Sequence, residues 1–127
     1  MTDATPGPDA DLPATDASAL DRLRRFGGGK LLREMIALFL AAAPERIQAA
    51  RSAEARGDAH DIELALHSLK SSSAQLGAMQ MRRLCEAGEQ RARAKSLDGL
   101  RQLIDELENE YARIREWLTN ARDEGAA

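Results

Sequence analysis

Apolar residues recur at helical spacing along most of the chain, and no segment alternates apolar and polar residues as a strand does. The clearest stripe follows Ser96, which we expect to cap the last helix, and its members are Leu97, Leu100, Ile104, Leu107, Tyr111, Ile114 and Leu118. Steps that alternate between three and four residues are typical of helices packed in a bundle. Residues 123–127 follow this stripe and are expected to fray.

A short helix is expected near the N-terminus. Ser18 and Asp21 have the spacing of a capping box, with Asp in place of Glu. The apolar residues of this helix are Leu20, Leu23 and Phe26. Three consecutive glycines, 27–29, are expected to end it. Residues 1–17 hold three of the four prolines and no periodic apolar residues, which favours a disordered or loosely ordered tail.

Four further helical segments follow. The segment 30–43 has a wide apolar face, made of Leu31, Leu32, Met35, Ile36, Leu38, Phe39 and Ala42, and is expected to be well buried. Pro44 should kink this helix or begin a new one over 44–56. Asp58 can cap a helix over 58–76, and another helix is expected over 78–94. Gly57 precedes the segment 58–76 and Gly77 follows it, which marks both boundaries.

These elements predict an all-α protein. Short connections between long amphipathic helices favour antiparallel neighbours, so we expect an antiparallel up-down four-helix bundle over 18–122. The short N-terminal helix would be an addition to this bundle. The length of 127 residues fits one domain.

Composition excludes several classes of protein. A net charge of −3 argues against a nucleic-acid-binding surface. No apolar run is long enough to cross a bilayer, and no signal peptide is evident, so we expect a cytoplasmic protein without membrane contact. Cys85 is the single cysteine, which rules out an intramolecular disulfide, and we expect it to pack in the core.

The segment 58–76 carries a histidine on its polar side. At about 100° per residue, one side of this helix collects the apolar residues and one serine, namely Ile62, Leu66, Leu69, Ser73 and Leu76. His67 points about 140° away from that side, so we expect it to be exposed. A solvated surface histidine is the simplest interpretation. A metal site would require a second ligand one turn away, and Lys70, three residues on, opposes a cation there, so we expect no metal.

A cation next to an exposed histidine suits phosphoryl chemistry. A neutral imidazole is a nucleophile available near neutral pH. A phosphoryl group on the ring of His67 would add about two negative charges. Lys70 can reach such a group as a point charge.

The run from His67 to Ala78 resembles the motif of histidine-containing phosphotransfer (HPt) domains. This motif is H-x-L-K-G, followed by small residues and ending in the dipeptide Gly-Ala. The resemblance extends over about residues 18–118, with matching features at 26–29, at Ala43-Pro44-Glu45 and at 84–86. It implies a phosphorelay intermediate in two-component signalling, without kinase activity of its own.

The resemblance also implies roles and partners. His67 would exchange a phosphoryl group with the aspartate of a response-regulator receiver domain, and Lys70 would stabilise that group. A histidine kinase or hybrid kinase would be the other partner. The receiver would bring the magnesium ion, so no cofactor is expected in this chain, which we expect to be a monomer.

Two residues depart from the family pattern. Ser71 stands where the family usually has glycine after the lysine, and we expect it to tune docking of the partner. Glu89 stands where several members carry glutamine, and we assign it no binding role because a carboxylate would repel a phosphoryl group. Leu64 lies on the far side of the helix from the core. It would either join Ser71 and Ala74 in a docking surface or contact the N-terminal helix.

Two other functions are weighed against phosphotransfer. The first is a non-catalytic helical interaction module, against which the pair His67 and Lys70 argues. The second is an acid–base enzyme that uses His67 with Glu63, which a convex helix without an evident substrate pocket disfavours.

Overall fold

The computed structural model describes residues 12–125, and most of these residues are helical. The elements are α1 (Ala17–Ala55), α2 (Ala59–Gln75), α3 (Met79–Arg93) and α4 (Leu100–Gly125). Between residues 12 and 125 the only β-type pairing outside the helices is an isolated bridge between Thr15 and Ala78. The prediction of an all-α bundle is confirmed.

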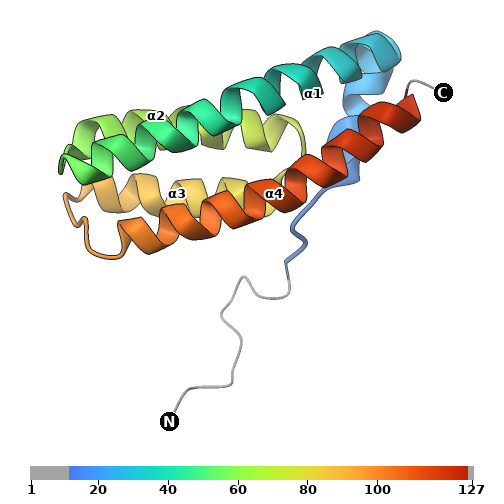
Figure 1. Cartoon of the computed structure of the whole chain (residues 1–127). Coiled ribbons are helices and arrows are strands. Elements are labelled where there is room, and N and C mark those ends of the chain that lie inside the picture. Colours follow the sequence, from blue (N-terminus) through green and yellow to red (C-terminus); the bar gives the residue numbers. More distant parts are fainter. Residues whose placement is uncertain (1–11, 126–127) are drawn as a thin grey trace.

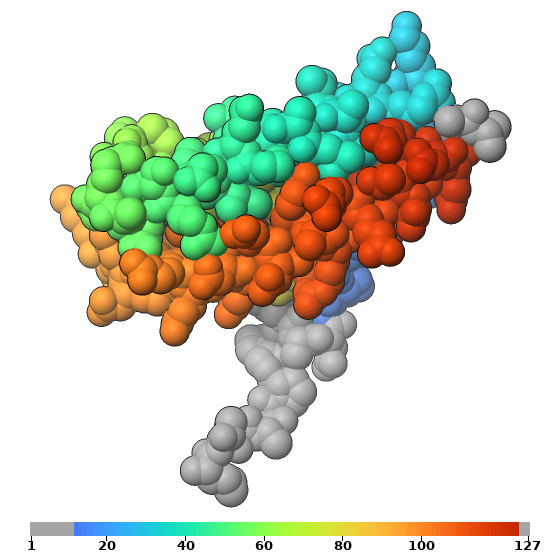
Figure 2. Space-filling view, viewed as in Figure 1, coloured from blue at the N-terminus to red at the C-terminus, as the bar shows by residue number. Residues whose placement is uncertain are grey.

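The helices form a closed bundle in which each one packs against two neighbours. Both α1 and α3 contact α2 and α4. Figure 1 shows successive helices running in opposite directions, as an up-down bundle requires. Figure 2 shows the face that α1 and α4 form together. Because α2 and α4 are diagonal to each other, their outer surfaces lie on opposite sides of the molecule.

A kink divides α1 where the sequence predicts the end of a short helix. Gly27 and Gly28 have non-helical backbone angles, and the φ of 70° at Gly28 is one that glycine adopts without strain. The short N-terminal helix is thus the first part of α1, turned away from the rest (Figure 1). Asp16 caps it, because its carboxylate accepts the backbone N–H of Ser18 at 3.0 Å. A capping box that begins at Ser18 is therefore wrong.

The main part of α1 continues through Pro44, so the predicted start of a new helix there is wrong. Within α1, non-helical angles occur only at the glycine kink. Proline lacks the N–H that would bond the carbonyl of Leu40, four residues earlier. The hydroxyl of Tyr111 in α4 donates to this carbonyl at 3.2 Å instead. A contact between helices thus replaces the bond that proline removes.

The chain before α1 binds the turn between α2 and α3. The carbonyl of Ala14 accepts the backbone N–H groups of Met79 and Gln80 at 2.9 and 3.1 Å. These are the first residues of α3, whose N-cap residue makes no side-chain hydrogen bond. Of the predicted N-terminal tail, residues 1–11 lie outside the described part of the chain.

The last helix begins later than predicted, at Leu100. Ser96 does not cap it, because it lies four residues before Leu100, in the preceding loop, where its N–H donates to the carbonyl of Arg91 at 2.9 Å. The helix reaches Gly125 and thus covers part of the segment that we expected to fray. Residues 126–127 lie outside the described part.

The core follows the predicted faces with two exceptions. Every member of the α4 stripe is buried except Leu97, which is partly buried, and Cys85 is fully buried as predicted. Phe26 and Leu38, by contrast, are 91% and 65% exposed. Leu38 lies about 200° around the helix from the buried Ile36, so it faces away from the bundle. No helix in residues 12–125 is long and apolar enough to span a membrane.

Candidate phosphotransfer site

The side chain of His67 is exposed on the outer face of α2, as the helical wheel predicts. Its exposed fraction is 62%. The opposite side of the helix is buried and consists of Ile62, Ala65, Leu66, Leu69 and Ser73. Asp58 caps the start of α2 by accepting the N–H of Asp61 at 3.0 Å, also as predicted. A partner can therefore reach the ring of His67 without opening the core.

A carboxylate from α3 contacts the ring of His67. The two oxygens of Glu89 lie 3.1 and 3.3 Å from the ring nitrogen Nδ1. The side chain of Glu89 is only 3% exposed. The structure thus places at the site a residue to which the sequence analysis gave no role.

Close packing of α2 on α3 brings this carboxylate to the histidine. Gly88 precedes Glu89, and a Cβ atom at Gly88 would lie 2.6 Å from the Leu66 side chain. A side chain at position 88 would therefore displace the end of the Leu66 side chain. Leu66 immediately precedes His67, so this close contact lies next to the site.

Two cations share the carboxylate of Glu89. The ammonium group of Lys70 donates to it at 3.2 Å, and the guanidinium of Arg93 donates at 2.8 Å. Arg93 also reaches the carboxylate of Glu63 at 3.2 Å, so it bridges α3 and α2. Burial alone would raise the pKa of Glu89, but the hydrogen bonds and charges of Lys70 and His67 together outweigh it and hold the pKa below 4.5. Glu89 is therefore ionised at neutral pH.

The other predicted site residues surround His67 on the surface. Lys70 is partly buried, and Ser71 is exposed, with its hydroxyl donating to the backbone carbonyl of His67 at 3.3 Å. Ala74 is partly buried one turn further on. Leu64 is 55% exposed. All of them belong to α2, so the helix itself brings them to one region of the surface.

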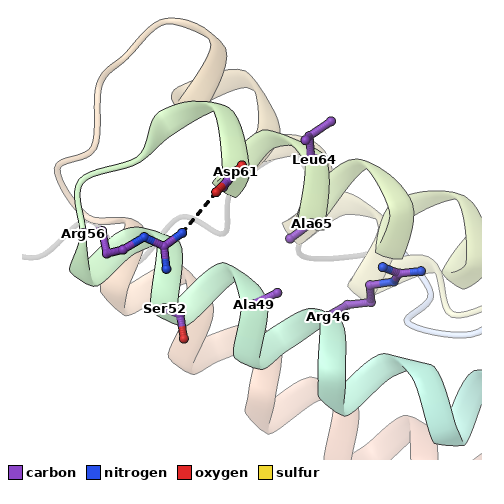
Figure 3. Close-up of a pocket in the computed structure, with 7 residues that line it drawn as sticks. All are labelled: Arg46, Ala49, Ser52, Arg56, Asp61, Leu64 and Ala65. Carbon is purple, nitrogen blue, oxygen red and sulfur yellow. Dashed lines mark hydrogen bonds and ion pairs between the residues drawn. The ribbon is translucent and has the colours of Figure 1, made fainter.

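Leu64 borders a groove between α1 and α2 (Figure 3). The groove has a volume of about 320 Å³, and its lining residues are Arg46, Ala49, Ser52, Arg56, Asp61, Leu64 and Ala65. Arg56 is paired with Asp61 at 3.1 Å. The α1 residues here come from the main part of the helix, not from the N-terminal segment that we considered as a contact of Leu64.

A second shallow groove lies between α1 and the C-terminal half of α2. Its lining residues are Met35, Leu38, Phe39, Ala42, Ser72, Gln75 and Leu76. The helical pattern of the sequence predicts Leu38 on a buried face, and its position on the surface is therefore a correction to that prediction. Ser72 and Gln75 lie close in sequence to the predicted docking residues Ser71 and Ala74, so this groove adjoins the predicted docking surface.

Within residues 12–125, neither Cys85 nor Glu63 offers a competing site. Burial raises the pKa of Cys85 to about 12, so its thiol is not a thiolate at neutral pH. Glu63 is paired with Arg93 at 3.2 Å, whereas the carboxylate that contacts His67 belongs to Glu89. The acid–base pair of His67 with Glu63 that we weighed is therefore not the arrangement found.

Glu89 has a signal in the sequence that could have revealed it. It lies four residues after Cys85 and three before Ala92, both of which belong to the buried side of α3. A carboxylate at a core position is rare unless it is paired. Its position in the stripe therefore indicates a polar contact with a neighbouring helix.

The comparisons agree with this geometry. The Hpt domain model matches residues 34–117. Among solved structures, the chain is similar to histidine-containing phosphotransfer protein B (HptB) from Pseudomonas aeruginosa PAO1. The identity is 26% and the TM-score 0.84, over 89% of this chain and 97% of that one. A search of curated protein sequences found no match. The chain belongs to the Hpt domain family, whose members carry phosphoryl groups in two-component signalling.

Proposed function

We propose that the protein is a phosphorelay intermediate that carries a phosphoryl group on His67. The observation that carries this proposal is the exposed imidazole of His67, with the ammonium group of Lys70 on the same face of one rigid helix. Phosphoryl transfer depends mostly on positioning and on stabilisation of charge. The rigid face of α2 holds His67 in position and supplies the positive charge of Lys70, and these two residues form half of the reaction site.

The other half comes from a receiver domain. In the proposed reaction an aspartyl phosphate of the receiver donates its phosphoryl group to His67, or His67 returns it to the receiver aspartate. The receiver brings the magnesium ion that neutralises charge on its own side. Lys70 bonds Glu89 in the resting protein, and its ammonium group has three donors, so it can also bind a phosphoryl oxygen.

The receiver docks, in this proposal, on the surface around His67. Leu64 stands beside the histidine on one side, and Ser71 and Ala74 follow on the other. Leu38 adds an exposed apolar side chain from α1. Apolar side chains at the centre of a contact, ringed by polar ones, are typical of protein interfaces.

A transfer assay tests the proposal. Receiver domains from the same organism are phosphorylated with radiolabelled acetyl phosphate and magnesium, and then mixed with the wild type or with single variants. We expect acid-labile, alkali-stable label on the wild type and on His60→Gln, and none on His67→Gln. His60 is the matched control because it is an exposed histidine on the same helix.

The assay also covers Lys70 and the alternative function. Lys70→Ala should slow transfer by about 100-fold, which is typical of losing one group that stabilises transition-state charge. Lys30→Ala, which removes an exposed lysine of α1, should leave the rate unchanged. A wild-type protein that binds a receiver but takes no label would instead be a non-catalytic interaction module.

A further inference from the structure

We propose that Arg46 is a specificity-determining residue for the receiver, and that it selects receiver domains which place a carboxylate in the groove between α1 and α2. The proposal rests on the function proposed above, because it names a chemical property of the partner of the same site. Arg46 binds the partner and not the phosphoryl group, so its effect should appear in the affinity of the two proteins.

The groove of Figure 3 lies beside the part of α2 that carries the phosphoryl group in the proposed function. Leu64 and Ala65 line it, three and two residues before His67. A stable protein interface buries about 800 Å² of each partner. A receiver that reaches His67 therefore also covers residues one turn away, and the groove is among them.

Arg46 lies at the end of the groove nearer to His67. The pair of Arg56 with Asp61, at 3.1 Å, marks the other end (Figure 3). Arg46 precedes Arg56 by ten residues, which is about 15 Å along α1. Since α1 and α2 run in opposite directions, the same distance along α2 leads from Asp61 past His67. Arg46 is therefore about level with the transfer site, across the groove.

The charges of the groove do not balance. Arg56 and Asp61 neutralise each other. Arg46 is exposed, and within residues 12–125 no acidic side chain pairs with it. The groove thus has one positive charge to which this part of the chain gives no counter-charge. A partner of complementary charge must supply an anion at this end.

Short side chains leave room for the anion. Ala49 of α1 and Ala65 of α2 line the groove, whose volume is about 320 Å³. The methylene groups of an acidic side chain of the partner can pack on these alanines while its carboxylate meets Arg46. A guanidinium binds a carboxylate through two parallel hydrogen bonds, and the exclusion of water by the surrounding contact strengthens their attraction.

The same groove discriminates against other side chains of the partner. A lysine or arginine would be repelled by Arg46. An apolar side chain would cover the guanidinium without pairing it, and a covered charge without a partner lowers the affinity. Arg46 therefore favours receivers with a carboxylate at this position over receivers with a neutral or basic residue.

Titration calorimetry with the unphosphorylated receiver domains of the same organism tests the selection. For the receiver that binds the wild type best, Arg46→Glu should weaken binding by about 100-fold and Arg46→Gln by about 10-fold, as the loss of a charge pair in an interface does. Equal affinities of the wild type and both variants would overturn the proposal.

Arg115→Glu is the matched control for these titrations. Arg115 is also exposed and has no acidic partner within residues 12–125, but it lines a different groove, between α1 and α4. We expect the affinity for the receiver to stay unchanged in this variant. A loss as large as that of Arg46→Glu would show that any cation of the protein attracts the receiver, and would overturn the selection by Arg46.

A charge swap identifies the carboxylate of the partner. In the same receiver, each aspartate and glutamate around the phosphoacceptor aspartate is replaced singly by lysine, and each variant is titrated with the wild type and with Arg46→Glu. We expect one lysine variant that binds Arg46→Glu about tenfold more tightly than it binds the wild type. If no lysine variant prefers Arg46→Glu, the proposal is overturned.

Transfer kinetics show at which step Arg46 acts. Rates are measured over a range of concentrations of the phosphorylated receiver. Arg46→Glu should raise the concentration for half-maximal transfer and leave the maximal rate within about twofold of the wild type, because it removes binding and not transition-state stabilisation. A maximal rate that falls while the half-saturating concentration stays the same would assign Arg46 to the chemical step and overturn its role in selection.

The two proposals fail in different ways. Affinities are measured without any phosphoryl group, so they test Arg46 independently of the label on His67. Absence of label on His67 overturns the proposed function. Equal affinities of the wild type and the Arg46 variants overturn the role of Arg46 and leave phosphotransfer on His67 intact.

Discussion

Tyr111 of α4 supplies Leu40 of α1 with the hydrogen bond that Pro44 takes away. The tyrosine hydroxyl donates to the Leu40 carbonyl at 3.2 Å. That carbonyl is four residues before the proline, where an ordinary helix would receive a backbone N–H. The ring of Tyr111 is largely buried and lies 6.3 Å from the ring of Phe39, measured between centroids. One side chain thus both packs α4 on α1 and keeps α1 helical across a proline.

Tyr111→Phe should therefore destabilise the protein by about 1–2 kcal/mol, because a partly buried carbonyl loses its donor. Urea unfolding measures this loss. In the background of Pro44→Ala, which restores a backbone N–H at position 44, the same substitution should cost much less. Equal losses in the two backgrounds would show that the hydroxyl does not act through the Leu40 carbonyl.

Gly77 closes α2 and lies against the chain that precedes α1. Its φ is 75°, its carbonyl accepts the N–H of Asp16 at 2.8 Å, and a Cβ atom there would overlap the carbonyl of Asp16. Gly77→Ala should cost about 2–3 kcal/mol, since it combines backbone strain with loss of this contact. Gly57→Ala is the matched control, with a φ of 69° but open space around it, and should cost only about 1 kcal/mol. Equal losses of stability in urea would contradict the importance of the Asp16 contact.

Leu64→Asp should weaken binding of the receiver without unfolding the protein. The side chain is 55% exposed, so its replacement costs little in the core. A charge in an apolar contact should lower the affinity by at least tenfold, about 1.4 kcal/mol. Titration calorimetry with the receiver measures this, and Ala112→Asp on the outer side of α4 serves as control. Equal affinities of the two variants would exclude Leu64 from the docking surface.

The stability conferred by Glu89 should depend on pH. Its pKa in the folded protein lies below 4.5, because the contacts with Lys70 and His67 together outweigh the opposing effect of burial. The unfolded chain then binds the proton more readily, so the contribution is fully present above about pH 4.5 and is lost as the pH falls below that value. In urea unfolding, the advantage of the wild type over Glu89→Gln should shrink below about pH 4.5. An advantage that grows on acidification would contradict the direction of this pKa shift.

Much of the fold was predictable because it depends on local patterns. The period of the apolar residues placed His67 on the outside of α2, and the structure agrees with it. Asp58 was likewise recognisable as a cap, because its partner lies three residues away. The helical continuity at Pro44 was not predictable, since it depends on Tyr111, which is distant in sequence.

Of the candidate site, only the residues on α2 were predictable from the sequence. His67 and Lys70 share one helix, so their spacing alone brings them together. Glu89 comes from α3, and its contact with His67 depends on how α2 and α3 pack against each other. The expectation that a carboxylate would only repel a phosphoryl group did not consider the hydrogen bond to Nδ1. A helical wheel describes one helix, so it contains no information on the distance between residues of two different helices.

The most direct test of the central claim locates the phosphoryl group after transfer. The wild-type protein is labelled by a phosphorylated receiver, digested under alkaline conditions and mapped by mass spectrometry. We predict a phosphohistidine at His67, in the peptide that also contains Lys70. A phosphoryl group on His60, or an acid-stable one on Ser71, would contradict the assignment of His67 as the phosphoryl carrier.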